Sequence, residues 1–544
     1  LGSLKKFKSS KNSSIHPIQN SFIKHSATQC GYCTPGFIMS AYASILNQHN
    51  NLNDKSNSDT FDIEDLHKFD GNLCRCTGYR SIIDSLREFS KSPLPSDDSI
   101  SYDETGLKTY EMSSRIPIIP DFFKEAPNIN ICIHYKGMAF IIPDSVENLL
   151  SIKKECIENN CSEDTRIIVG STEISVDISQ NRIIAPKQGQ VFISTFLMPE
   201  LSHISIENGN EIVIGANTPL NDILKFIKED EKVKNLKTIE EKRFITEFIR
   251  RIETFGSNQI RNVASIVGNI CHGGAATDIS NFLLAMKATL VIKDCLTQKT
   301  ITREMDNSFY LSYRKVDLKP SEIVIEIKLK IPNKNEFVST FKQGHRRDDD
   351  ICIVSSTIFA SVSESNTVEE IRVAYSGMSA FPVRATLVEN FLRGKTFSIE
   401  NIEKSFNLID QIFPLDEKSP GGFPKFRLQV SKSFIFRFFH QTQRDRGLPY
   451  DQSATEIIDN PAKKAFKIGG CHCKEEKKKS QKDDDFDVIG LPFHHSTAAS
   501  HVTGESVFVD DMPNTIDTLH AAFVTSSIPH GRILDIDFTE SLLI

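Results

Sequence analysis

Two short-spaced cysteine pairs stand out in the first hundred residues. Cys30 and Cys33 lie in QCGYCTPGF, and Cys74 and Cys76 lie in GNLCRCTGYR. Cysteines one residue apart do not easily bond to each other, because a disulfide needs a particular Cα separation and side-chain direction. Each pair also precedes a predicted helix, whose N-terminal N–H groups favour thiolates. Four such thiolates suit a tetrahedral zinc ion or an iron–sulfur cluster.

The spacing leaves both metal centres open. Zinc sites of four cysteines are common, but the single residue between Cys74 and Cys76 is shorter than the roughly two to four of zinc knuckles. Unrelated buried cysteines are less favoured, because paired short spacings are a strong signal. Gly31, Gly36 and Gly78 would let the backbone approach such a centre closely.

Two glycine-containing turns form a second candidate site. RIIVGSTEIS, 166–175, predicts a strand that runs into a Gly-Ser-Thr turn, and FGSNQIRNVASIVGNICHGGAATD, 255–278, ends at Asp278. Backbone N–H groups and small hydroxyls at such turns can surround a phosphate. Each turn alone is more typical of an ordinary tight turn. Together they could hold the pyrophosphate of a dinucleotide.

Periodicity indicates which elements position these residues. Apolar residues at helical spacing predict helices over 37–46 and 82–89, with Pro35 suited to a first turn. From about 133 to 330, short strands alternate with helices, which predicts an α+β or α/β domain. A further mixed segment follows, with strands expected over 337–343, 356–365 and 368–378, and helices over 401–413 and 431–443.

The last hundred residues read differently. A charged run predicts a flexible connector over 446–485, in which Cys471-His472-Cys473 is more typical of a linker than of a metal site. HVTGESVFVDDMP and TLHAAFVTSSIPHGRILDIDF predict the opening strands of another domain. The chain begins without Met and stops at SLLI, so we expect an internal piece of a longer protein.

Composition excludes several classes. The 544 residues predict roughly three or four domains, and a net charge of −7 gives no reason to expect nucleic-acid binding. No apolar stretch approaches the roughly eighteen residues of a membrane helix, and 1–14 has no signal-peptide core. The other eight cysteines are scattered, as in a reduced cytoplasmic protein.

The motifs resemble those of a known family. QCGYCTPGFIMS and GNLCRCTGYRSI resemble the helical [2Fe–2S] domain of the molybdenum hydroxylases, which include xanthine dehydrogenases and aldehyde oxidases. The resemblance implies that Cys30, Cys33, Cys74 and Cys76 ligate one cluster. The two turns resemble the family's FAD domain, in which the first turn wraps the diphosphate, the second supports it and Asp278 binds the sugar. The FAD contacts that this resemblance implies are Ile167, Ile168, Val169, Gly170, Ser171, Thr172, Glu173, Ile174, Phe255, Ser265, Ile266, Val267, Gly268, Asn269, Asp278 and Lys342.

Three further stretches bear on the resemblance. CHGGAAT, 271–277, departs from the family pattern, and we expect His272 to be a solvent-facing loop histidine rather than a flavin contact. FKQGHRRDDDI, with Arg346, Arg347, Asp348, Asp349 and Asp350, resembles a loop beside the flavin in xanthine dehydrogenases that influences NAD⁺ access, and favours that branch over aldehyde oxidases. GLPFHHSTAASHVTGESVFVDDMP resembles the start of the molybdenum domain, so His494 and His495 are expected to pack between domains.

The resemblance therefore implies a multidomain α+β fold. Its parts are a helical [2Fe–2S] domain (15–92), a linker (93–132), an α/β FAD-binding domain of the vanillyl-alcohol-oxidase type (133–332), a small α+β flavoprotein C-terminal domain (333–445), the connector (446–485) and the truncated start of a molybdopterin-binding domain (486–544). Catalytic molybdenum-site residues are expected beyond Ile544.

The implied function is that of an oxidoreductase of purine catabolism. This portion would pass electrons from the molybdenum site through [2Fe–2S] to FAD and on to NAD⁺ or O₂, while the full homodimeric enzyme would hydroxylate hypoxanthine and xanthine to urate. The alternatives are an aldehyde oxidase-like enzyme, a zinc-stabilised binding module without redox activity, and a degenerate family member kept as a scaffold.

Overall fold

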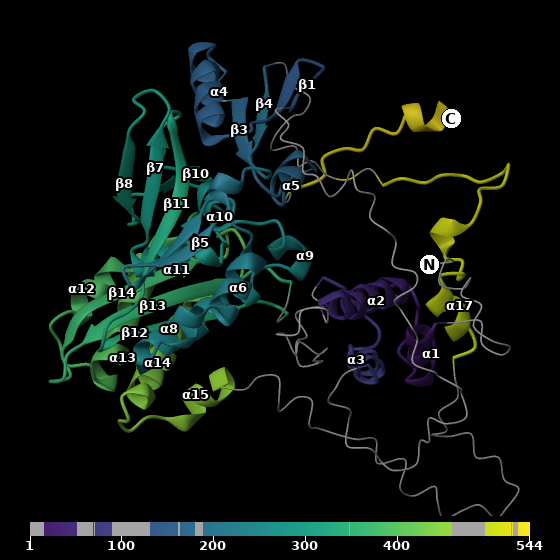
Figure 1. The fold of residues 1–544 in the computed structure, drawn as a ribbon. Coiled ribbons are helices and arrows are strands. Elements are labelled where there is room, and N and C mark those ends of the chain that lie inside the picture. The colour runs from purple at the N-terminus through teal and green to yellow at the C-terminus, as the bar shows by residue number, and fades with distance from the viewer. Residues whose placement is uncertain are drawn as a thin grey trace, which may run out of the picture. The chain divides into compact units, whose positions relative to one another are not determined.

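A computed structural model describes residues 16–51, 69, 71–89, 131–161, 164–179, 189–346, 349–459, 495–523, 525 and 531–543 (Figure 1). The 93–130 part of the expected linker, the Cys471-His472-Cys473 stretch and His494 lie outside these residues. The chain divides into two compact units, one of 1–39, 76–86 and 494–544 and one of 40–75 and 87–493. In the described parts of the chain, no helix is both long and apolar enough to cross a membrane.

The first unit is helical. Its elements are α1 (Pro17–Lys24), the start of α2 (Thr34–Asn51), α3 (Arg80–Arg87) and α17 (Ala498–Thr503), with the 3₁₀ turns η10 (Val509–Asp511) and η11 (Glu540–Leu543). Pro17 at the first position and a capping box between His16 and Gln19 start α1. Phe37, Ile38 and Ile82 are buried, which confirms the helical periodicity expected for α2 and α3.

The strands expected after residue 500 are not formed among the described residues. The stretch that begins HVTG instead ends the short helix α17, which packs against α1. A strand needs a neighbouring strand to satisfy its N–H and C=O groups, and no pairing with this stretch is found in the described residues. The prediction of a strand in the stretch that begins HVTG was therefore wrong.

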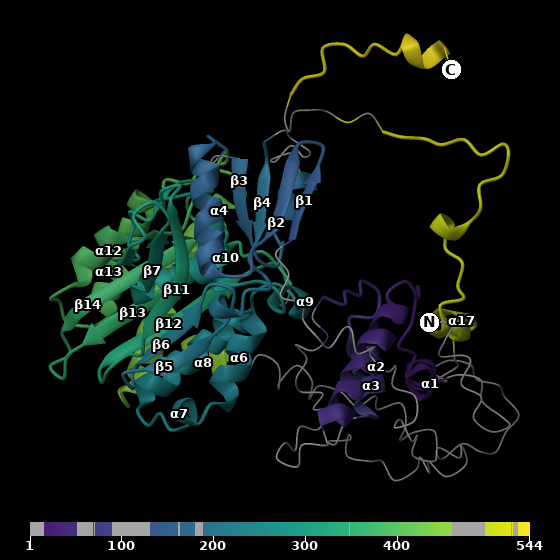
Figure 2. The ribbon, with the colours of Figure 1, turned by 45° about the horizontal axis from the view of Figure 1, so that its top comes forward.

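The second unit begins with a small mixed sheet, whose strand order is β1-β2-β4-β3. Its elements are β1 (Ile131–Tyr135), β2 (Met138–Ile142), α4 (Val146–Glu158), β3 (Thr165–Ile168), α5 (Ile174–Ser179) and β4 (Val191–Ser194). Strands β2 and β3 both pair in parallel with β4, as helical crossovers require. Leu149 and Leu150 of α4 pack with Ile193 of β4, and Figure 2 shows α4 lying along this sheet.

A five-stranded antiparallel sheet follows, in the order β5-β6-β11-β7-β8. Its strands are β5 (Ile204–Glu207), β6 (Glu211–Gly215), β7 (Thr289–Asp294), β8 (Thr300–Glu304) and β11 (Glu322–Lys330), with a small hairpin of β9 (Tyr310–Ser312) and β10 (Lys315–Val316). The accompanying helices are η7 (Pro199–Leu201), α6 (Leu220–Glu229), α7 (Glu231–Lys234), α8 (Ile239–Glu253), α9 (Asn258–Arg261), α10 (Ile266–His272) and α11 (Ile279–Met286). The rings of Phe248 in α8 and Phe282 in α11 stack at 5.1 Å in the core.

The last sheet is a meander, β12 (Glu336–Gln343), β13 (Val354–Val362), β14 (Val368–Ser376) and β15 (Val383–Arg384), with α12 (Thr386–Leu392), α13 (Ile399–Ile412), α14 (Pro424–Asp445) and α15 (Gln452–Asp459). Neighbouring residues of one strand point to opposite faces. Val338 accordingly joins the core that contains α8 and α11, while Phe337 joins the core under α13 and α14. The sheet thus lies between two helical layers.

The predicted strands and helices of 337–443 are confirmed by this arrangement. The expected flexible connector, however, does not start at residue 446. Leu448 and Asp451 are hydrogen-bonded to α14 through Gln443 and His440, and helix α15 follows and packs against α14. Helix α15 was not predicted from the sequence, because the charged residues that follow it made the whole stretch look like a connector.

Candidate flavin and cluster sites

The two cysteine pairs stand at the starts of α2 and α3. The N–H of Phe37 donates to the carbonyl of Cys33 at 3.2 Å, and the N–H of Ile83 donates to the carbonyl of Tyr79 at 2.9 Å. Gly31 and Gly78 have φ angles of +82° and +62°, a conformation that favours glycine. The sequence therefore bends sharply into each helix directly beside a cysteine.

One cysteine of each pair meets the other. The Sγ atoms of Cys30 and Cys76 lie 3.4 Å apart, well beyond the roughly 2.05 Å of a disulfide. Both residues are exposed, whereas Cys33 is half-buried and Cys74 is buried. In the part of the chain that the structure describes, no group of three or more His, Cys, Asp or Glu side chains is arranged to hold a metal ion. The donors that the structure brings together for a cluster are the thiols of Cys30 and Cys76, each four residues before the first residue of a helix.

The two glycine turns also meet. Strand β3 ends at Ile168, and a Cβ atom on Gly170 would lie 2.2 Å from the carbonyl oxygen of Val263. Such an approach is closed to any residue with a side chain. Val263 lies just before Ser265, whose Oγ accepts a hydrogen bond from the N–H of Gly268 at 3.1 Å and caps α10. The first turn and the start of α10, predicted as parts of one site, are thus side by side.

The second turn is held by side-chain hydrogen bonds. Asn269 Oδ1 accepts from the hydroxyls of Thr277 at 2.5 Å and Ser280 at 3.3 Å. These bonds join α10 to the start of α11 across the CHGGAAT stretch. They fix the position of Asp278, the residue before α11.

Asp278 and Lys342 form a buried ion pair. Lys342 Nζ donates to Asp278 Oδ2 at 2.6 Å and to the carbonyl of Thr254 at 2.7 Å. Asp278 Oδ1 lies 3.7 Å from Arg251 Nη1 but has no hydrogen-bond partner among the described residues. A buried carboxylate oxygen without a donor is costly. The hydroxyl of a bound sugar would supply that donor, so these residues fit the sugar end of a dinucleotide.

Arg251 is a functional candidate that sequence reasoning missed. Its guanidinium is buried and donates to Ser355 Oγ at 2.6 Å and to the carbonyls of Ser356 at 2.8 Å and Phe341 at 3.2 Å. Burial lowers its pKa below the usual arginine value, although the nearby carboxylate of Asp278 opposes that shift. Asp278 is thus flanked by two buried cations, which keep its carboxylate ionised as an acceptor for a ligand hydroxyl.

Arg314 is the second residue that was missed. It lies in the β9–β10 turn, and its guanidinium bonds to the carboxylates of Glu173 and Asp177. Its Nη2 also lies 2.8 Å from Nε2 of His272, which is itself 3.2 Å from Glu173 Oε1. The expectation of a solvent-facing loop histidine is therefore wrong: His272 ends α10 and is largely covered by this network. Nothing in the local sequence around Arg314 signals these partners.

The predicted flavin residues thus fall into two connected groups. Residues 167–174 follow β3 and are joined to α10 by the Gly170–Val263 approach and by Arg314. Lys342 bonds to both Asp278 and the carbonyl of Thr254, and Thr254 directly precedes Phe255. Ile167, at 37% exposed, and Ser171 lie at the surface, whereas Ile266 is buried in the core and supports α10 by packing.

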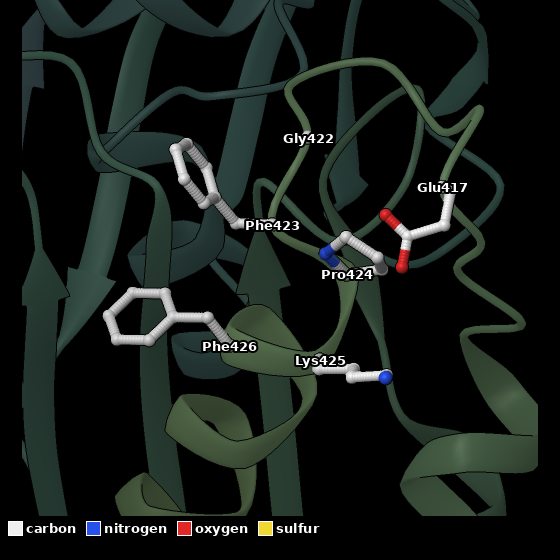
Figure 3. A pocket seen from close by; sticks show the side chains of 6 residues that line it. All are labelled: Glu417, Gly422, Phe423, Pro424, Lys425 and Phe426. Atoms are coloured by element: carbon white, nitrogen blue, oxygen red, sulfur yellow. The ribbon is translucent and has the colours of Figure 1, made fainter.

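The loop that favoured the dehydrogenase branch is described in part, because Arg347 and Asp348 lie outside the described residues. Asp350 Oδ2 accepts from the N–H of Arg346 at 2.8 Å, which closes the loop on itself. The ring of His345 lies edge-on to Phe423 at 6.0 Å. Phe423 lines an open pocket formed by the loop before α14 and by the first residues of that helix, where Figure 3 shows Phe423 and Phe426 on one side of Pro424 and Glu417 on the other. None of the predicted site residues lines that pocket.

Of the two histidines expected to pack between domains, His494 lies outside the described residues, and only His495 can be described. His495 is exposed, and its Nδ1 lies 2.8 Å from the hydroxyl of Thr497, two residues along the same segment. The buried histidine of this segment is His501, which contacts the turn between Cys30 and Cys33.

Three family models match the chain. Residues 5–87 match a [2Fe-2S] binding domain, residues 135–334 match the FAD binding domain in molybdopterin dehydrogenase, and residues 339–442 match the CO dehydrogenase flavoprotein C-terminal domain.

Relatives match over nearly the whole chain. Xanthine dehydrogenase 2 of Arabidopsis thaliana is 30% identical over 96% of this chain and 40% of its own length. Xanthine dehydrogenase/oxidase of Rattus norvegicus is 28% identical over 97% of this chain and 40% of its own length. Among solved structures, the carbon monoxide dehydrogenase from Hydrogenophaga pseudoflava matches 56% of this chain and 96% of that chain, at 18% identity and a TM-score of 0.46. The chain therefore spans about 40% of the length of these curated relatives.

Proposed function

Since the chain belongs to the molybdenum hydroxylase family and is xanthine dehydrogenase-like over nearly all of its length, we propose that it is the electron-transfer portion of such an enzyme. Cys30, Cys33, Cys74 and Cys76 would hold a [2Fe–2S] cluster. The loops around Gly170 and Ser265, with Asp278 and Lys342, would hold FAD. When bound, the cluster supplies one-electron transfer, and the flavin exchanges single electrons for pairs.

The residues of this chain would bind and orient these groups. Gly170 has no side chain, so its turn packs directly against Val263. This contact would hold the backbone of 168–173 where it can approach the diphosphate. Asp278 would accept a sugar hydroxyl at Oδ1, while Lys342 holds Oδ2 in place. Arg314 would keep the two loops together by bonding Glu173 on one side and His272 on the other. The single observation that carries the flavin site is the Oδ1 of Asp278, which accepts no hydrogen bond from the described residues although its carboxylate lies between two buried cations.

The contact between Cys30 and Cys76 is what supports the cluster site. The two thiols come from segments 46 residues apart and meet at 3.4 Å. Both are exposed, so one edge of the bound centre would face solvent or a neighbouring electron carrier.

We further propose that the whole enzyme hydroxylates purines, uses NAD⁺ as acceptor, is a homodimer and works in the cytoplasm. The xanthine dehydrogenase relatives support the purine substrate, and the arginine–aspartate loop 341–351 supports NAD⁺. The scattered cysteines support a reducing compartment.

An absorption spectrum tests the proposal. Purified protein is expected to show charge-transfer bands of an iron–sulfur centre together with flavin absorption, and NADH is expected to bleach both. A colourless zinc-containing protein would refute it in favour of a binding module. Colour that NADH leaves unchanged would favour the aldehyde oxidase alternative.

Cysteine variants locate the cluster. Cys30→Ser and Cys76→Ser are each expected to remove the charge-transfer bands and leave the flavin bands in place. Cys132→Ser is the matched control, because Cys132 is an exposed cysteine of β1 outside the proposed ligand set. Loss of the bands in the control alone would contradict the ligand assignment.

A further inference from the structure

We propose that residues 495–508, which we call the clamp segment, complete the cluster domain, and that His501 in it is the positioning residue that holds the turn between Cys30 and Cys33. This inference rests on the proposed function, because it takes those two cysteines as cluster ligands. The clamp segment is separated from them by more than 460 residues of sequence but belongs to the same compact unit.

The His501 imidazole lies directly on the turn. An added Cβ on Gly31 would lie 2.3 Å from both Cγ and Cδ2 of His501, so the ring fills the space that a side chain would need. Gly31 has a φ of +82° and stands between Cys30 and Cys33. Position 31 therefore needs a glycine for two reasons: the backbone has a positive φ there, and the His501 ring occupies the space of a side chain.

Hydrogen bonds fix the plane of that ring. His501 Nδ1 lies 2.9 Å from the hydroxyl of Thr28, and Nε2 lies 3.2 Å from the hydroxyl of Thr497. The hydroxyl of Thr34 donates to Thr28 Oγ1 at 3.1 Å. A hydroxyl can both donate and accept, so a neutral imidazole is satisfied at both nitrogens. Because Thr28 and Thr34 bracket the two cysteines, the ring connects to the turn on both sides.

The clamp segment is anchored on either side of His501. The buried amide of Gln19 in α1 donates to the carbonyl of Val502 at 2.8 Å, and Val502 is itself fully buried. Farther along, Phe508 lies edge-on to Tyr32 with ring centroids 5.3 Å apart. Tyr32 is the residue between Gly31 and Cys33, so the segment contacts two successive residues of the turn, Gly31 through His501 and Tyr32 through Phe508.

These contacts make the clamp segment a support for the cluster ligands. Residues that orient a metal ligand typically change metal affinity by about 10–100-fold when they are replaced. The turn is exposed at Cys30, which contacts Cys76, while His501 and Phe508 of the clamp segment contact Gly31 and Tyr32. We therefore expect removal of the imidazole to loosen the ligand turn without disturbing the flavin loops, which lie in the other unit.

The test compares His501→Ala with His501→Gln in the full chain. The rate at which a chelator removes iron is expected to rise about 10–100-fold in His501→Ala, and the low-temperature electron paramagnetic resonance lines of the reduced protein are expected to broaden. His501→Gln keeps a hydrogen-bonding group of similar reach and is expected to restore most of both properties. His520→Ala, which changes an exposed histidine beyond the clamp segment, is expected to match the wild type.

A glycine pair provides a second test. Gly31→Ala and Gly78→Ala place a side chain at positive φ in both cases, but only position 31 faces the ring, since nothing lies within 4 Å of an added Cβ at position 78. Iron loss to the chelator is expected to be at least tenfold faster in Gly31→Ala than in Gly78→Ala. Equal rates would overturn the inference.

Two failures remain distinguishable. Wild-type protein without iron and acid-labile sulfide would refute the proposed function itself. Wild-type protein with a full cluster, together with His501→Ala that retains iron and its resonance spectrum unchanged, would refute only the clamp. The flavin content of each variant reports on folding, and a variant with normal flavin but rapid iron loss supports the inference.

Discussion

At the scale of single residues, the proposed flavin site depends on charges that are buried and paired across elements. Asp278 precedes α11, Lys342 lies in β12 and Arg251 in α8, so three elements converge on one carboxylate. A buried charge is tolerated only when it is compensated. The pairing therefore stabilises the fold and prepares the site at the same time.

Replacement of Asp278 by Asn should be severe. The change leaves Lys342 and Arg251 as two buried cations without a counter-charge, which costs about 3–5 kcal/mol. We expect the free energy of unfolding in urea to fall by that amount and the bound FAD to be lost. Asp317→Asn is the control, because Asp317 is exposed and pairs with Arg303 at 3.4 Å, a contact worth less than about 1 kcal/mol. Equal losses in the two variants would contradict this assignment.

Glu247 is expected to make the stability of the folded protein depend on pH. It is fully buried, with Oε1 2.8 Å from Arg243 Nη2, while Oε2 accepts from the N–H and hydroxyl of Thr340. Burial raises the pKa of this carboxyl, but Arg243, Arg250 and the Thr340 hydrogen bonds outweigh burial and hold the pKa below its usual value. A lowered folded-state pKa stabilises the protein above the unfolded value of about 4.3, and that stability is lost as the pH falls through the folded value.

Glu247→Gln should therefore differ from the wild type in a pH-dependent way. At pH 7 we expect a loss of about 3 kcal/mol, because two arginines lose their partner. The difference should shrink as the pH falls from about 4.3 towards the lowered folded-state pKa, since the unfolded chain then binds a proton at Glu247 that the folded protein does not yet bind. Urea unfolding followed by circular dichroism at pH 7 and at acid pH measures both values. A difference that stays constant with pH would rule out the charge as the cause.

At the scale of elements, the site depends on how closely two loops approach. The turn after β3 and the turn before α10 touch at Gly170 and Val263, and the β9–β10 hairpin delivers Arg314 to both sides. The first contact requires the absence of a side chain, and the second requires a long cation. Each contact joins two segments, so a change in either segment is enough to break it.

Gly170→Ala should open this junction. The added Cβ would lie 2.2 Å from the carbonyl oxygen of Val263, so backbone must move, at a cost of about 1–3 kcal/mol. We expect FAD affinity, measured by the quenching of flavin fluorescence, to fall by about tenfold or more, because 1.4 kcal/mol corresponds to a factor of ten. Gly209→Ala serves as the control: its φ is +77° but the surrounding space is open. Unchanged affinity in Gly170→Ala would show that the two loops do not act together.

Helices and strands were predicted from the sequence more successfully than the buried charges that connect them. Helices α2 and α13 and strands β3 and β12 were expected from the residue pattern, because the burial of one face repeats locally along the chain. Glu247, Arg251 and Arg314 were missed, because burial of a charge depends on partners far away in sequence. Helix α17 was read as a strand, since residue type alone does not show whether a neighbouring strand is present.

At the scale of the whole molecule, the chain links two cofactor-binding parts in one sequence. The matched [2Fe-2S] and FAD domains follow each other along the chain, which spans about 40% of the length of its xanthine dehydrogenase relatives. The clamp segment adds a connection that the domain order does not predict, because residues near 501 belong to the same compact unit as Cys30. We expect internal deletion of 495–508 to weaken cluster retention while leaving the flavin in place.

Iron and acid-labile sulfide, counted per chain in anaerobically purified protein, test the central claim most directly. A [2Fe–2S] cluster on Cys30, Cys33, Cys74 and Cys76 predicts about two irons and about two sulfides per chain, both lost together in Cys30→Ser. About one zinc per chain, with neither iron nor sulfide, would contradict it.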